Sequence, residues 1–473
     1  MRRSKIICTI GPASQDLQTI KELIQAGMNI ARLNASHGDF ATLEKIISNV
    51  RIAAKGLHKT IGILLDLEGP HVRVGDIAGG QVELHEAQEL IITSSQILGN
   101  SKYISINYKN IIKDVKTGNN ILLDDGNIKL QVVKKSVNGL HCTVLDGGLL
   151  KSHKSVNVPG VYLNLPSLTN KDLAYIKFGI QNNVDFFGLS FVRQTQDVIK
   201  VKNLVNKLKA KTWVIAKIEH PLAVANIDDI INAADGIMIA RGDLGVELPT
   251  EDVPIVQKAI IRKCNAFAKP VITATQMLES MIDNMIPTRA EATDVANAII
   301  DGTDAVMLSG ETAVGKHPAL VVHTMEKIIL KAETSMDYDK IFESKKTIRS
   351  VGNIPHAVSH ATIQAAIDLK AGAIITATKS GQTARLIACH RPSAFIYAIT
   401  TDKDNVRKLN LLWGVIPYHI AKFIRNTDQM IEYSMKVVKQ HKRVQSGDTV
   451  VITSGAPVGI AGKTNMLEIN VIK

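Results

Sequence analysis

The chain has 473 residues, 45% of them hydrophobic and 21% charged, a composition typical of a globular protein with about two to four domains. No apolar run approaches the roughly 20 residues of a membrane-spanning helix, and the four cysteines are too scattered for a disulfide framework or a zinc site, so we expect a cytoplasmic protein. The net charge is +12, but basic residues are dispersed and aromatic residues make up only 4%, so binding to nucleic acid or membranes is not expected.

Eight apolar segments with strand character each end in a cluster of polar residues. They are 5–10, 29–33, 61–65, 184–189, 213–216, 236–240, 271–273 and 305–308. Helical patterns lie between them, for example at 16–25, 197–208, 255–267 and 288–300. Strands that are apolar throughout and alternate with helices predict a parallel sheet buried on both faces. Eight such units favour an α/β fold of the (β/α)8 TIM-barrel type over an open doubly wound sheet.

Two regions depart from this alternation. Residues 71–158 contain short strands separated by turn signals, which predicts a small all-β domain inserted after the third barrel strand. Such an insertion can close over a barrel mouth as a lid. A strand–helix pattern restarts near the end of the chain and predicts a C-terminal α/β domain. The expected division is a barrel in 1–70 and 159–344, a lid domain in 71–158 and a regulatory domain in 345–473.

Three charged residues at neighbouring strand ends carry the main chemical signal. Lys217 and Glu219 are two positions apart, so their side chains point the same way from a strand, and Asp243 follows the next strand. Two carboxylates with open positions suit Mg²⁺, and a nearby lysine adds positive charge where a phosphoryl group passes. The alternative is a purely structural ion pair between Lys217 and Glu219.

A second group of strand-end residues suits anions and small cations. Arg32, Asn34 and Ser36 alternate, so they share one face. The arginine can bind phosphate, and the oxygens of Asn34 and Ser36, with those of Asp66, suit a monovalent cation. The alternative is that these polar residues cap the following helix.

Two loops offer backbone amides to an anion. The glycines of 241–245 allow a ligand to approach the backbone, and Pro249 is expected to begin the next helix. The second loop lies between a predicted strand and a predicted helix of the C-terminal domain and supplies hydroxyls, amides and a lysine. Its residues are Thr378, Lys379, Ser380, Gly381, Gln382 and Thr383. Ordinary helix capping is the alternative to a phosphate site here.

Four longer segments are the most specific in the chain. They are Met-Ile-Ala-Arg-Gly-Asp-Leu-Gly-Val-Glu at 238–247, Ala-Thr-Gln-Met-Leu-Glu-Ser-Met at 274–281, Pro-Thr-Arg-Ala-Glu at 287–291 and Met-Leu-Ser-Gly-Glu-Thr at 307–312. With them the chain resembles the pyruvate kinase family over almost its whole length, from 9–14 to 459–464. The resemblance implies transfer of a phosphoryl group from phosphoenolpyruvate to ADP, which yields pyruvate and ATP in the last step of glycolysis.

The resemblance also implies roles for individual residues. Lys217 would stabilise charge on the moving phosphoryl group and on the enolate oxygen, Thr275 would lie where a proton reaches the enolate through water, and Arg32 would bind phosphate. The other implied assignments are Glu219 and Asp243 to Mg²⁺ or Mn²⁺, Gly242, Asp243 and Thr275 to the substrate carboxylate, and His37, Arg73 and Lys154 to the nucleotide. The family is usually a homotetramer, and the C-terminal domain would hold a phosphorylated effector.

One segment departs from the family pattern. The family often has Asp-Thr-Lys-Gly-Pro-Glu where this chain has Asp-Leu-Glu-Gly-Pro-His at 66–71. Members with Glu at the last position generally need K⁺, and members with Lys there generally do not. A protonated His71 could replace the charge of K⁺, whereas a neutral one could not. We expect weak K⁺ dependence, with Asn34, Ser36, Asp66 and the Leu67 carbonyl as the K⁺ ligands.

The sequence leaves other functions open. A metal-dependent aldolase or a Schiff-base lysine enzyme acting on pyruvate or phosphoenolpyruvate would also use a barrel, and a basic binding protein that has lost catalysis would keep the fold. The effector could be a sugar bisphosphate, a sugar monophosphate or AMP, or there could be none, since Gln382 stands where some relatives have a basic residue.

Overall fold

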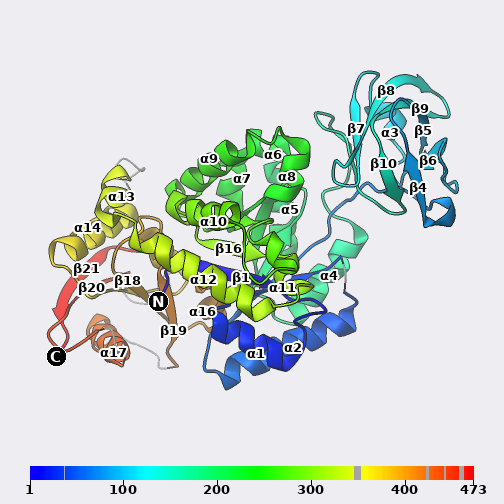
Figure 1. The fold of residues 1–473 in the computed structure, drawn as a ribbon. Coiled ribbons are helices and arrows are strands. Elements are labelled where there is room, and N and C mark those ends of the chain that lie inside the picture. The colour runs from blue at the N-terminus through cyan, green and yellow to red at the C-terminus, as the bar shows by residue number, and fades with distance from the viewer. Residues whose placement is uncertain (37, 346–352, 422–425, 441–443, 457–462) are drawn as a thin grey trace.

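The structure, a computed structural model, describes residues 1–36, 38–345, 353–421, 426–440, 444–456 and 463–473. At its centre, parallel strands form a closed barrel in the order β1-β16-β15-β14-β13-β12-β3-β2 (Figure 1). The strands are β1 (Lys5–Thr9), β2 (Ile30–Asn34), β3 (Gly62–Asp66), β12 (Phe186–Leu189), β13 (Trp213–Ile218), β14 (Gly236–Ala240), β15 (Val271–Ala274) and β16 (Ala305–Leu308). Because β1 pairs with β16, the ring is closed, which confirms the predicted barrel and excludes the open sheet.

The barrel strands are buried on both faces. Alternate residues point inward and outward, so that Ile7 and Met238 belong to a cluster inside the barrel while Ile6 and Ile237 pack with the surrounding helices. All residues of β14 are buried. This double burial is the physical reason why the strand segments are apolar throughout instead of alternating.

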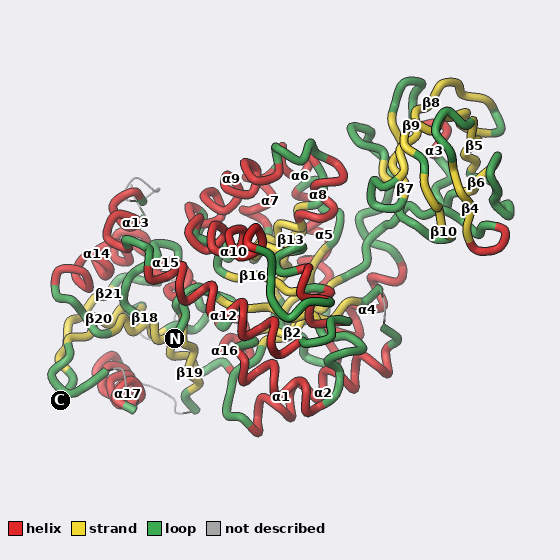
Figure 2. The backbone as a smooth tube through the Cα atoms, in the orientation of Figure 1, coloured by secondary structure: helices red, strands yellow, loops and turns green. Residues whose placement is uncertain are grey.

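Helices surround the strands, as Figure 2 shows in red and yellow. They are α1 (Leu17–Ala26), α2 (Phe40–Gly56), α4 (Asn170–Gln181), α5 (Thr195–Lys207), α6 (Pro221–Ala225), α7 (Ile227–Ala233), α8 (Arg241–Glu247), α9 (Val253–Ala266), η2 (Glu279–Ile282), α10 (Arg289–Asp301), α11 (Gly310–Ala313) and α12 (Pro318–Thr334). A capping box of Thr288 and Glu291 begins α10, and Gly302, with φ 99°, ends it. The expectation that Pro249 begins a helix is wrong. The residues before it, 241–247, are themselves helical, and the next helix, α9, begins only at Val253, with a different proline in its first turn.

The inserted segment forms a separate β structure that projects from one end of the barrel (Figure 1). It contains η1 (Ala78–Gly80), β4 (Gln81–Leu84), β5 (Glu89–Thr93), β6 (Tyr103–Ser105), α3 (Ile111–Asp114), β7 (Asn120–Leu123), β8 (Ile128–Ser136), β9 (Gly139–Asp146), β10 (Gly148–Lys151) and β11 (Val156–Asn157). Strands β10 and β4 form one sheet, and β11-β7-β8-β9-β5-β6 form another. The segment has a hydrophobic core of its own, which includes Leu90, Ile104 and Leu130.

The C-terminal part is an α/β domain on the side of the barrel away from the inserted segment (Figure 1). It contains α13 (Tyr338–Ser344), α14 (Ile354–Asp368), β17 (Ala373–Ala377), α15 (Gln382–Ala388), β18 (Phe395–Thr400), α16 (Lys403–Leu409), β19 (Val415–His419), α17 (Thr427–Lys439), β20 (Thr449–Ser454) and β21 (Met466–Val471). Its sheet has the order β19-β18-β17-β20-β21, in which only β21 is antiparallel to its neighbour. A buried ion pair of 2.9 Å between Arg391 Nη2 and Asp304 Oδ2 joins this domain to the barrel. Among the described residues, no helix is long and apolar enough to cross a membrane.

Candidate active site

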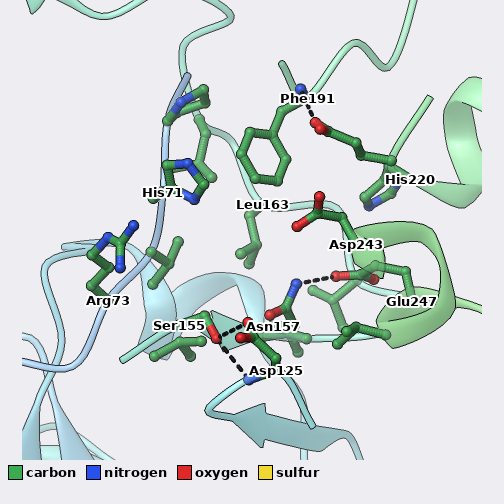
Figure 3. Close-up of a pocket in the computed structure, with 18 of the residues that line it drawn as sticks. His71, Arg73, Asp125, Ser155, Asn157, Leu163, Phe191, His220, Asp243 and Glu247 are labelled. Carbon is green, nitrogen blue, oxygen red and sulfur yellow. Dashed lines mark hydrogen bonds between the residues drawn. The ribbon is translucent and has the colours of Figure 1, made fainter. Parts of the chain in front are cut away.

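A cavity of about 300 Å³ lies between the barrel mouth and the inserted segment. Its barrel side includes Glu219 and Asp243, which follow β13 and β14, and its other side includes His71, Arg73 and Lys154 of the inserted segment. Figure 3 shows His71, Phe191 and Asp243 around this space. The carboxyl ends of parallel barrel strands meet at one face, and this is why strand-end residues far apart in the sequence share the cavity.

Lys217 is the buried cation of the site, with only 11% of its side chain exposed. Its Nζ lies 2.8 Å from Glu219 Oε1 and 3.3 Å from Asp66 Oδ1, and it donates a hydrogen bond of 2.7 Å to Ser190 Oγ. Burial alone would lower the pKa of Lys217, but the carboxylates of Asp66 and Glu219 outweigh it and raise the pKa above its usual value. Lys217 therefore carries a fixed positive charge at neutral pH.

Asp243 lies beside Glu219, and the charge of nearby Lys217 compensates only part of the resulting repulsion. Among the described residues, its carboxylate makes no hydrogen bond and no ion pair. Glu219 is engaged, since its Oε2 accepts a hydrogen bond of 2.7 Å from the backbone amide of Phe191. Burial, followed by repulsion from Glu219, raises the pKa of Asp243 to about 7. An unpartnered carboxylate next to a second carboxylate is a donor set that fits a hard divalent cation.

The described residues contain no group of three or more His, Cys, Asp or Glu side chains that could hold a metal. A cation bound by Glu219 and Asp243 alone would therefore keep positions for substrate oxygens and water. This is the usual arrangement for Mg²⁺, which binds one or two carboxylates together with phosphate oxygens.

Arg32 is tied to Asp66 across neighbouring strands. Its Nε and Nη2 donate hydrogen bonds of 2.8 and 2.6 Å to Asp66 Oδ2, and its Nη1 donates one of 3.0 Å to Thr9 Oγ1. Burial would raise the pKa of Asp66, but Lys217 and Arg32 lower it. Because a guanidinium has five N–H donors, Arg32 keeps some of them for an anion in the mouth.

The four residues expected to bind K⁺ lie at the ends of β2 and β3. Asn34 pairs in register with Asp66, and its Oδ1 accepts a hydrogen bond of 3.1 Å from the Ser36 amide. The Leu67 carbonyl accepts one of 2.8 Å from Ser190 Oγ. The structure thus brings these oxygens to the same strand ends, although Asn34 and Leu67 already have protein partners.

Thr275 adopts a left-handed backbone conformation, with φ 67°, at the end of β15. Its Oγ1 accepts a hydrogen bond of 2.8 Å from the Gly242 amide at the start of α8. Arg241 stabilises this bend, because its Nη2 donates 2.7 Å to the Thr275 carbonyl and its Nη1 pairs with Asp294 at 2.7 Å. The Gly242 amide and the Thr275 hydroxyl therefore meet at one point, where an acceptor oxygen of a ligand could replace their mutual bond.

The residues predicted to face the nucleotide are only partly covered by the structure. His37 lies outside the described residues. Lys154 pairs with Asp124 at 2.6 Å, and Arg73 Nη1 donates 3.0 Å to the His153 carbonyl. His71 packs edge-on against Phe191, with 4.7 Å between ring centroids, and burial, followed by the charge of Arg73, lowers the pKa of His71.

The C-terminal loop of 378–383 is anchored within its own domain. Gly381 donates 2.9 Å to Thr378 Oγ1, Thr383 Oγ1 lies 2.8 Å from Thr464 Oγ1, and Asn405 Nδ2 donates to the Lys379 carbonyl. Thr378 bonds to the amide of Gly381, the N-cap residue of α15, and no described side chain caps the first turn of that helix. These bonds do not decide between helix capping and a phosphate site.

The sequence reasoning missed three residues of the cavity and its base. Ser190, at the end of β12, connects Lys217 to the Leu67 carbonyl. Asn157 and Glu247 form a hydrogen bond at the edge of the cavity (Figure 3). The position of Ser190 at a strand end is a sequence signal that could have identified it. The sequence contains no signal for the pairing of Asn157 with Glu247, because these residues are 90 positions apart.

The fold and these contacts define a class of enzyme. A closed barrel that carries a buried lysine and two carboxylates at its strand ends, beneath an inserted domain, is a (β/α)8-barrel enzyme whose mouth is built for an anionic substrate.

Comparisons with known proteins narrow the class. Family models described as "Pyruvate kinase, barrel domain" and "Pyruvate kinase, alpha/beta domain" match residues 1–322 and 356–470. The pyruvate kinases of Geobacillus stearothermophilus and Sporosarcina psychrophila are 48% and 46% identical, over all of this chain and 80% and 81% of theirs. The crystal structure of a pyruvate kinase from Cryptosporidium parvum matches with a TM-score of 0.95 and 39% identity, covering 100% of this chain and 96% of that one.

The chain belongs to the pyruvate kinase family. It is accordingly a phosphotransferase of glycolysis that uses phosphoenolpyruvate and ADP and forms pyruvate and ATP.

Proposed function

We propose that this reaction takes place at the barrel mouth, with Lys217 as the central catalytic residue. The observation that carries the proposal is the buried ammonium of Lys217, which lies 2.8 Å from Glu219 and beside the unpartnered Asp243. A fixed positive charge at this point would stabilise the transferred phosphoryl group and the enolate oxygen left behind. The raised pKa also speaks against a Schiff-base lysine, which must be neutral to attack a carbonyl.

Glu219 and Asp243 would hold Mg²⁺ or Mn²⁺. When bound, the cation neutralises negative charge on the phosphoryl oxygens and supplies a Lewis acid next to Lys217. The raised pKa of Asp243 supports this assignment, because a divalent cation would relieve the repulsion between the two carboxylates.

The substrate carboxylate would bind at the start of α8. The amides of Gly242 and Asp243 belong to the first turn of this helix, where backbone N–H groups favour anions. The Thr275 hydroxyl, now bonded to Gly242, would turn to the carboxylate and lie where a proton reaches the enolate through water. Arg32 would use its remaining donors to bind the phosphate.

We assign the nucleotide to the side of the cavity formed by the inserted segment, with Arg73, Lys154 and His37. The residues 71–158 would act as a lid that excludes water during transfer. The remaining expectations are proposals as well: a cytoplasmic homotetramer, and a phosphorylated effector bound by Thr378, Lys379, Ser380, Gly381, Gln382 and Thr383.

A K⁺ ion would bind between Asn34, Ser36, Asp66 and the Leu67 carbonyl. The expectation of weak K⁺ dependence rests on a protonated His71, but the lowered pKa of His71 favours the neutral ring at pH 7. We therefore infer that His71 does not replace the cation at neutral pH and that K⁺ stimulates the enzyme.

The assay is pyruvate formation from phosphoenolpyruvate and ADP with Mg²⁺, for the wild-type protein, Lys217→Met and the exposed control Lys177→Met. We expect Lys217→Met to lower kcat by about 10²- to 10³-fold, the usual cost of removing one preorganised electrostatic group, and the control to match the wild type. Equal turnover by Lys217→Met would refute the role of this lysine. Inactivation of the wild type by borohydride with pyruvate would favour the Schiff-base alternative.

A further inference from the structure

The inserted segment touches the barrel through the helix that carries the proposed carboxylate site. Glu247, the last residue of α8, accepts a hydrogen bond of 2.9 Å from Asn157 Nδ2 (Figure 3). Asn157 ends β11, the last strand of the inserted segment. In the described part of the chain, this is the only hydrogen bond from residues 71–158 to a helix or strand of the barrel.

A turn of the inserted segment lies close to the same end of α8. A Cβ atom added to Gly126 would be 4.0 Å from Val246 Cγ1, at the outer limit of van der Waals contact. The turn is fixed from within, because Ser155 Oγ donates 2.6 Å to Asp125 Oδ1 and accepts 2.8 Å from the Asp125 amide. Residues from two different parts of the inserted segment therefore converge on Val246 and Glu247.

The carboxylate of the half-buried Glu247 is only partly satisfied. Its Oε2 is buried and has no hydrogen-bond partner among the described residues. Burial raises the pKa of Glu247, and the bond from Asn157 only partly opposes this shift. Glu247 also lines the cavity, so the contact with Asn157 lies where a movement of the inserted segment would reach the proposed active site.

Helix α8 can transmit this contact to the substrate. It has seven residues, which is about two turns, so its two ends are about 10 Å apart and can move together as one rigid unit. One end bears Gly242 and Asp243, and the other bears Val246 and Glu247. A shift of the inserted segment that pulls on Glu247 would tilt the amides and the carboxylate at the opposite end.

We propose that Asn157 and Glu247 form a latch that couples the seating of the lid to the orientation of α8. Glu247 is then a positioning residue for the reaction, acting through Gly242 and Asp243. The inference rests on the carboxylate and metal roles proposed above for those two residues.

The test exchanges donor and acceptor. Asn157→Asp places a second carboxylate opposite Glu247 and breaks the bond, while the double variant Asn157→Asp/Glu247→Gln restores it in the reverse direction. We expect the single variant to lower kcat/KM for phosphoenolpyruvate by about 10-fold, the scale of a hydrogen bond to a charged group, and the double variant to recover most of it. Glu247→Gln alone keeps an acceptor oxygen for Asn157, so it should lower kcat/KM less than Asn157→Asp does.

The control Asn138→Ala, in an exposed turn of the inserted segment, should leave kcat and KM unchanged. Thermal unfolding of each variant separates misfolding from loss of coupling. If Asn157→Asp does not fold, Asn157→Ala, Glu247→Ala and their double variant provide a second double-mutant cycle. Additive losses with no recovery in the double variant would overturn the latch. If the wild type itself has no turnover, the proposed function fails instead, so the two failures are distinguishable.

Discussion

Replacing Asp243 by Asn should stabilise the metal-free protein at neutral and alkaline pH while abolishing its metal binding. Burial and Glu219 raise the pKa of Asp243 from 3.8 to about 7, so the folded state holds its proton more tightly than the unfolded state. Stability from this group is fully present below the unfolded value and is lost as pH rises towards 7. Asparagine resembles the protonated side chain and avoids that loss.

The magnitude follows from the shift. A difference of about three pKa units corresponds to about 4 kcal/mol, and solvent in the cavity could halve it, so we expect Asp243→Asn to gain about 2–4 kcal/mol at pH 8. For a domain of barrel size this is a rise in Tm of about 4–16 °C. The gain should shrink as pH falls towards 4.

The assay is thermal unfolding in EDTA and in excess Mg²⁺ at pH 5 and pH 8. Mg²⁺ should raise the Tm of the wild type, since a ligand of the folded state stabilises it, and should not raise that of Asp243→Asn. The exposed Asp146→Asn serves as the control and should change neither Tm nor its response to Mg²⁺. A lower Tm for Asp243→Asn in EDTA at pH 8, or an undiminished response to Mg²⁺, would refute the argument.

Two further predictions concern the K⁺ site and the domain interface. At pH 7.5, K⁺ should stimulate the wild type and His71→Gln to the same extent, relative to a tetramethylammonium control, because the ring of His71 is neutral. The variant His71→Lys should need less K⁺, because the charge of lysine is fixed. A strong response in the wild type that is missing in His71→Gln would contradict a neutral His71. Arg391→Leu would leave Asp304 buried without its cation and should lower the free energy of unfolding, measured in urea, by about 3–5 kcal/mol. A decrease below about 1 kcal/mol would show that this ion pair does not join the domains.

Much of the site could be read from the sequence because strand ends of a parallel barrel share one face. Lys217, Glu219 and Asp243 were predicted together for this reason, and the structure brings them together. The helix at 241–247 could not be predicted, because its glycines favour a loop by local propensity and only packing at the barrel mouth stabilises them as a helix. The lowered pKa of His71 was equally out of reach, since it arises from burial against Phe191 and the charge of Arg73.

The sequence by itself determined the class of fold, the residue types at the strand ends and the resemblance to the family. These follow from local periodicity and from the order of residues along the chain. The tertiary structure alone decided that the barrel closes, that Asp66 lies 3.3 Å from Lys217, and that Asn157 reaches Glu247. Such contacts join residues distant in the chain, and their energies depend on burial, which becomes defined only when the separate segments pack together.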